Sequence, residues 1–196
     1  MEILEKILGS AARVKIMRLF LLNRSKAFSS KDVANRSRVS STIVRKEIKL
    51  LHTVGFLKKR PNDWIFNPAF KYGEEFNDLL VRSDSLKNET IMENFKKIGK
   101  MKLVITSGIF IKRDDSRVDL LIVGDKIKRG KLEEGIHKLE AELGTELSYA
   151  VFDTKEFIYR LNMYDKLVRD VLDYPHEVLM QAKDMAELST QFLKKA

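Results

Sequence analysis

The chain has 196 residues, of which 44% are hydrophobic and 33% are charged, and it contains no cysteine. This length fits one or two domains, and the apolar content is too high for a disordered chain. The longest uncharged stretch, residues 103–111, is too short to span a membrane as a helix, so we expect no membrane partner. Its acidic start predicts no secretory signal, and the lack of cysteine excludes disulfides and fits a cytoplasmic location.

Positive charge is concentrated in the first third of the sequence. Residues 1–67 contain 15 Lys and Arg against 5 Asp and Glu, which gives 15 − 5 = +10. Residues 68–196 contain 22 basic and 23 acidic residues, which gives −1. A charge imbalance of this kind favours association with a polyanion, and it says nothing about the fold.

The first third predicts three helices followed by a hairpin. We expect a helix over residues 10–22 with Ser10 as its N-cap, and a short helix over 31–35 capped by Ser30. A third helix, capped by Ser40 or Ser41, is expected to run to Thr53 and has apolar residues spaced by four and three positions. Two β-prone runs, 56–60 and 64–67, flank Pro-Asn-Asp and indicate a hairpin. This order is that of a winged helix-turn-helix.

The remainder predicts a small α/β domain. Residues 68–98 form connecting helices, expected over 68–81 and 89–98. Strands are expected over 103–106, 118–123 and 147–152. Helices are expected over 131–143, from an N-cap at Thr154 through Arg160 and beyond, and over 184–194. Tyr159, Met163 and Tyr164 are expected to pack under the sheet. The predicted fold class is therefore α+β, with domains over 1–67 and 99–196.

Ten residues of the basic third are candidates for DNA contact. The second helix of a helix-turn-helix enters the major groove, and Arg45 lies one turn into it, where a guanidinium can bind a guanine edge. The remaining candidates can contact phosphates or bases and are Lys31, Ser40, Ser41, Thr42, Lys46, Lys49, Lys58, Lys59 and Arg60. A solvated cationic face without a ligand is the alternative. Ile43 and Leu50 fit core, dimer contact or thymine-methyl contact.

Both parts of the chain resemble one family. The first part does so through LGSAARVKIMRLFLLN and SSKDVANRSRVSSTIVRKEIKLLHTVGFLKKR, the second through VITSGIFIKRDDSRVDLLIVGD and DTKEFIYRL. These segments resemble small prokaryotic proteins that join a winged-helix regulator domain, ArsR-like or MarR-like in outline, to a nucleotidyltransferase-like domain of the DNA polymerase β superfamily. The resemblance covers most of the chain.

The resemblance also implies a catalytic site, and this sequence departs from its pattern. Enzymes of the family carry Gly-Ser after one strand, Asp-x-Asp on the next and a third carboxylate beyond, which together hold a triphosphate and two divalent ions. Here the corresponding positions are Gly108, Ile109, Arg117 and Asp119, with Ser148 near the third carboxylate. We therefore expect a catalytically inactive domain without metal or cofactor.

The leading hypothesis is a sequence-specific, DNA-binding transcriptional regulator that is not an enzyme. We expect a homodimer formed through the helical start, where Ile3, Leu4, Ile7 and Leu8 are apolar, although packing on the chain's own core is the alternative. An active nucleotidyltransferase recruited by the basic domain is the runner-up, and an antitoxin-like protein-interaction module is the third candidate. A protein or nucleotide ligand at the second domain stays open, with Lys112 and Arg113 as nearby cations.

Overall fold

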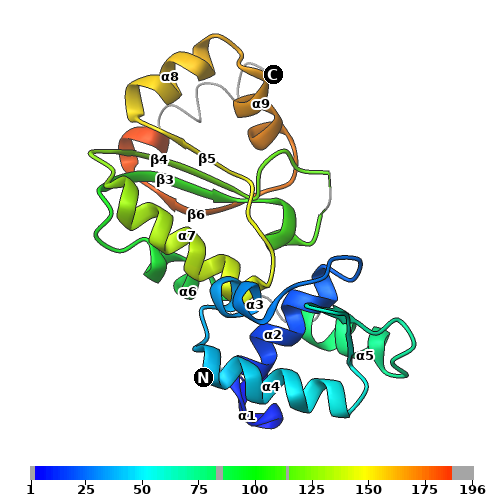
Figure 1. Ribbon diagram of the computed structural model, residues 1–196. Coiled ribbons are helices and arrows are strands. Elements are labelled where there is room, and N and C mark those ends of the chain that lie inside the picture. Colours follow the sequence, from blue (N-terminus) through cyan, green and yellow to red (C-terminus); the bar gives the residue numbers. More distant parts are fainter. Residues whose placement is uncertain (1–2, 83–85, 114, 187–196) are drawn as a thin grey trace. The chain divides into compact units, whose positions relative to one another are not determined.

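The computed structural model describes residues 3–82, 86–113 and 115–186 and has a mixed α and β fold (Figure 1). The chain divides into two compact units. The first consists of Met1–Leu86 and Ile136–Glu146, and the second consists of Lys87–Gly135 and Leu147–Ala196. Each unit is described separately below.

The first unit is mainly helical. Its elements are α1 (Ile3–Leu8), α2 (Ala11–Leu22), α3 (Ser30–Ser37), α4 (Ser41–Thr53), β1 (Leu57–Lys59), β2 (Trp64–Phe66), α5 (Gly73–Asn77) and a π-helical turn, Asp78–Arg82. The C-terminal half of α7 (Arg129–Leu143) also belongs to this unit. Fully buried side chains from α2, α3 and α4, such as Phe20, Val33 and Val44, form its core.

Local hydrogen bonds explain where the first helices begin. The Ser10 hydroxyl accepts from the N–H of Arg13 (3.2 Å), which confirms Ser10 as the cap of α2. The prediction that Ser30 caps α3 is wrong by one residue, because Ser29 and Asp32 form a reciprocal capping box. The hydrogen bonds from Ser29 hold the pKa of the Asp32 carboxyl below its usual 3.8.

The hairpin β1–β2 is tied to the segment that precedes α3. Leu57 pairs with Phe66 and Lys59 pairs with Trp64 in an antiparallel register. Phe28 adds a bridge on the other side of β2, where Phe28 and Trp64 exchange two backbone hydrogen bonds of 2.9 Å. The hairpin is thereby fixed along both edges of its second strand.

The second unit contains a four-stranded mixed sheet. Its strands are β3 (Lys100–Thr106), β4 (Leu120–Asp125), β5 (Tyr149–Phe152) and β6 (Glu177–Gln181), in the spatial order β5-β4-β3-β6. β4 and β5 are parallel, and β3 is antiparallel to both β4 and β6. The helices are α6 (Asn88–Asn94), the first half of α7, α8 (Thr154–Asn162) and α9 (Lys166–Asp173), with a short 3₁₀ turn over Gly108–Ile111.

Both faces of the central strands are buried. Leu121 and Val123 of β4 pack with Phe157, Leu161 and Val168 from α8 and α9, which lie over one face of the sheet (Figure 1). The alternate residues of β4, including Ile122, are fully buried as well. Covering on both faces accounts for the nearly uninterrupted apolar sequence of this strand.

Several predicted elements differ from the structure. The helix expected over 68–81 begins only at Gly73, because the preceding turns pack the ring of Phe70 against that of Phe56, with 5.3 Å between centroids. The helix expected over 89–98 ends at Asn94, and that expected over 184–194 lies mostly outside the described residues. The predicted strands are confirmed with shifted ends.

The second unit also corrects a predicted cap and a predicted packing. α8 is capped by Asp153, which accepts from the N–H of Glu156 (2.8 Å), and not by Thr154. Three side chains expected under the sheet are exposed by 64%, 64% and 66%, and these are Tyr159, Met163 and Tyr164. Among the described residues, no helix has the length and apolar character needed to cross a membrane.

Candidate nucleic-acid interface

All ten residues predicted to contact DNA are exposed in the structure. One lies on α3, six lie at the start or along α4, and three lie at the end of β1 and just beyond it. They are Lys31, Ser40, Ser41, Thr42, Arg45, Lys46, Lys49, Lys58, Lys59 and Arg60. The structure therefore presents every candidate to solvent and buries none of them.

The helical period of α4 separates its apolar face from its cationic face. Val44, Ile48 and Leu51 are at most 2% exposed and pack in the core. Because successive residues of a helix are rotated by about 100°, Arg45, Lys46 and Lys49 fall within an arc of about 100° on the outer side. Three cations thus share one exposed face of this helix.

No acid compensates this face. Between residues 33 and 62 the chain carries eight Lys and Arg and a single acid, Glu47. The Glu47 side chain is only 5% exposed, and its Oε2 accepts from Nε of Arg13 at 2.8 Å. In the described part of the chain, no carboxylate pairs with Arg45, Lys46 or Lys49. Their positive potential is therefore directed at solvent.

The start of α4 follows a tight turn. Ser40 occupies the N-cap position, and its hydroxyl makes no capping hydrogen bond. The preceding Arg38 adopts a left-handed conformation (φ 52°), and Val39 packs against the core. Arg38 is exposed beside this turn and was not among the predicted contacts. Its left-handed backbone is that of the C-cap of α3, where its N–H donates to the carbonyl of Asn35 (3.4 Å).

The hairpin carries the second group of cations. The N–H of Arg60 donates to the carbonyl of Asp63 (2.8 Å) and closes the loop. The Lys59 ammonium lies 4.3 Å from the centroid of the Trp64 ring, a cation–π contact. Among the described residues, neither Lys58 nor Arg60 forms an ion pair. The hairpin thus presents three cations, one of which is held by an aromatic ring.

Exposed apolar side chains lie on α4 and on α1. Ile43 and Leu50 of α4 are 45% and 40% exposed, so they are not core residues, and dimer or thymine-methyl contact stays open for them. On α1, Leu4 and Leu8 pack against the core, whereas Ile3 and Ile7 are exposed by 76% and 71%.

The second unit contains the positions that the sequence predicts to correspond to a nucleotidyltransferase site. Asp119 accepts two backbone hydrogen bonds, from Ile109 to Oδ1 and from Ser148 to Oδ2, both of 2.9 Å. Gly108 has a left-handed φ of 54°, and a Cβ there would overlap Oδ1 of Asp119. Arg117 forms an ion pair with Asp170 on α9. The structure therefore brings Gly108, Ile109, Asp119 and Ser148 together and directs Arg117 elsewhere.

Of the two cations predicted near this site, Arg113 is paired with an acid and Lys112 is exposed. Arg113 donates two hydrogen bonds to Asp115, of 2.9 and 2.6 Å, and this interaction lowers the pKa of the Asp115 carboxyl. Lys112 is exposed at a left-handed position. A hollow of about 350 Å³ is lined by residues that include Ser107, Arg117 and Lys166.

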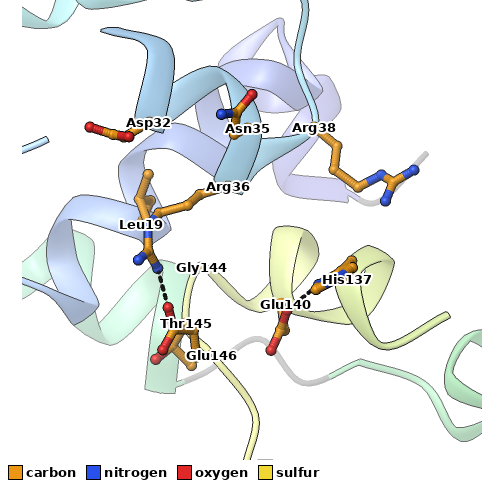
Figure 2. A pocket seen from close by; sticks show the side chains of 10 residues that line it. All are labelled: Leu19, Asp32, Asn35, Arg36, Arg38, His137, Glu140, Gly144, Thr145 and Glu146. Atoms are coloured by element: carbon orange, nitrogen blue, oxygen red, sulfur yellow. Dashed lines mark hydrogen bonds and ion pairs between the residues drawn. The ribbon is translucent and has the colours of Figure 1, made fainter. Parts of the chain in front are cut away.

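A hollow of the first unit lies elsewhere, between α3 and the end of α7 (Figure 2). It measures about 380 Å³. Arg36 pairs with Glu146 at 2.8 Å on one side, and His137 Nδ1 lies 2.9 Å from Glu140 on the other. Its charged lining is balanced between acids and bases, in contrast to the outer face of α4.

Comparisons with models of known families, with curated proteins and with solved structures give no match. The resemblance to the winged-helix and nucleotidyltransferase family therefore stays a prediction. Among the described residues, no three His, Asp or Glu side chains are grouped so as to hold a metal ion.

Proposed function

We propose that this protein is a sequence-specific, DNA-binding transcriptional regulator whose first unit is a winged helix-turn-helix. The element order supports this assignment: α2, the Phe28 bridge, α3, a tight turn, α4 and a hairpin follow one another. In this arrangement α4 is the recognition helix and β1–β2 is the wing.

The observation that carries the proposal is the uncompensated cationic face of α4. Arg45, Lys46 and Lys49 point to solvent on one side of the helix, and the only acid of that helix is buried against Arg13. A helix of this kind fits the major groove, where cations contact both phosphates and guanine edges. The exposed Ser40 hydroxyl and the free N–H groups of the helix start favour a phosphate.

We further propose that the second unit is a nucleotidyltransferase-like domain without catalysis. Divalent ions need carboxylate oxygens that are available to them, and both oxygens of Asp119 already accept backbone hydrogen bonds. The N–H of Gly108, which a phosphate would need, donates to the Ser116 hydroxyl at 3.0 Å. These contacts favour a structural role for Asp119.

The proposal is tested by selecting bound sequences from random DNA duplexes and then comparing the wild type with Arg45→Ala on the selected site. We expect an enriched sequence, an inverted repeat if the protein is a dimer, and a loss of about 1–3 kcal/mol of binding free energy in the variant together with relaxed sequence preference. Unchanged affinity and preference would show that Arg45 does not read the site. Tight Mg²⁺-dependent triphosphate binding that Asp119→Asn abolishes would support the enzyme instead.

A further inference from the structure

Trp64, the only tryptophan of the chain, contacts three other segments of the first unit: residues 28–30, α4 and β1. Its indole N–H donates to the Ser30 hydroxyl of α3 at 3.3 Å. Its ring lies 5.4 Å from that of His52 on α4, in an edge-to-face arrangement. Its backbone pairs with Phe28, and its ring face receives the Lys59 ammonium. Trp64 therefore joins the hairpin to both helices of the candidate interface.

The neighbouring contacts show how the hairpin is held on α4. His52 Nδ1 lies 3.1 Å from the carbonyl of Leu57, the first residue of β1. The half-buried Trp64 ring contacts both this histidine and the Lys59 ammonium. Direct side-chain contacts therefore link α4 to the hairpin, from His52 to Trp64 and from Trp64 to Lys59.

We infer that Trp64 is a positioning residue, which holds the cations of the hairpin in register with those of α4 so that both groups bind one DNA duplex. This inference rests on the proposed function. A two-stranded hairpin is marginal in isolation and needs packing to keep one orientation. Without the indole ring, we expect the hairpin to remain paired but to lose its fixed direction, and Lys58, Lys59 and Arg60 to contribute less to binding.

The test measures DNA affinity as a function of salt for Trp64→Leu and Trp64→Phe. Each phosphate neutralised in duplex DNA contributes about 0.9 to the slope of log K against log salt, so the loss of three hairpin cations should reduce the slope by about 2–3 in Trp64→Leu. Trp64→Phe keeps an aromatic ring beside His52 and Lys59, and we expect it to retain most of the slope. Phe76→Leu is the matched control, because this half-buried side chain packs against the same core from α5. It should leave the slope unchanged.

A second comparison keeps the inference testable if Trp64→Leu weakens the fold. In a chain that already carries Lys58→Ala, Lys59→Ala and Arg60→Ala, Trp64→Leu should cost little further affinity, because the cations it positions are gone, whereas a weakened fold would cost the same affinity in both backgrounds. An additive loss there, or an unchanged slope in Trp64→Leu, would overturn the inference. A wild-type protein without salt-dependent DNA binding would instead refute the proposed function itself.

Discussion

Replacing Arg45, Lys46 and Lys49 together by alanine should remove about half of the salt dependence of DNA binding. These side chains are exposed and make no contact with the core, which packs on the opposite face of α4 through Val44 and Ile48. Surface substitutions of this kind usually change stability by about 0.5 kcal/mol or less. The variant is therefore expected to fold and to differ from the wild type mainly in charge.

The magnitude follows from counting cations. Three cations on α4 and three on the hairpin give six, and at about 0.9 per phosphate the wild-type slope should be about −5. Between 50 and 200 mM salt this corresponds to an affinity loss of about 10³-fold. The triple variant should have a slope of about −3 and lose only about 40-fold over the same range.

Fluorescence anisotropy of a labelled duplex, titrated with protein at several salt concentrations, measures both slopes. Lys96→Ala serves as the control for net charge, because it removes a surface cation of the second unit that pairs with Glu93 at 3.1 Å. If the triple variant keeps the wild-type slope, the phosphates are not neutralised by α4 and our placement of the interface is wrong.

The remaining predictions concern the contacts that support the two sites. Glu47→Ala should lower the free energy of unfolding by about 2 kcal/mol in chemical denaturation, because it leaves the partly buried Arg13 without its carboxylate. A free energy of unfolding equal to that of the wild type would refute the importance of this pair. Asp119→Asn should cost about 1–3 kcal/mol in the same assay, because an amide can accept only one of the two backbone hydrogen bonds, and an unaltered unfolding midpoint would contradict that role. Asp32→Ala should lower the melting temperature at pH 6. Because the folded-state pKa of Asp32 is depressed by Ser29, its stabilisation is present above about pH 3.8 and lost as the pH falls through the lower folded value, so the difference between the two proteins should narrow in acid. A difference independent of pH would show that the carboxylate charge is unimportant.

Much of the helical structure of the first unit could be predicted, because the spacing of its apolar residues determines where the helices lie and which face each of them buries. The spacing of Val44, Ile48 and Leu51 sets the buried face of α4, and the same period places the cations outside. The two misplaced caps also had a local signal. In both, the true cap precedes an acid by three positions, as Ser29 precedes Asp32, and this spacing is more informative than the hydroxyl alone.

Other features depend on contacts that sequence spacing does not encode. The end of α7 packs in the first unit because the buried Arg18 and Asn23 donate to the carbonyls of Glu142 (3.0 Å) and Gly144 (3.0 Å), residues more than 120 positions away. Helical period does account for the exposure of Tyr159, which lies about 200° from the buried Phe157 on α8. The contacts of Trp64 with α3 and α4 could not be predicted from the sequence, because no motif links the three segments that they join.

The most direct test of the proposed interface is to map backbone amide chemical shifts of the ¹⁵N-labelled chain during titration with a selected duplex. We predict that the perturbed amides concentrate on α4 around Arg45 and Lys49 and on the hairpin from Lys58 to Trp64. Perturbations confined to the second unit, or spread evenly over the chain, would contradict the assignment of the first unit as the DNA reader.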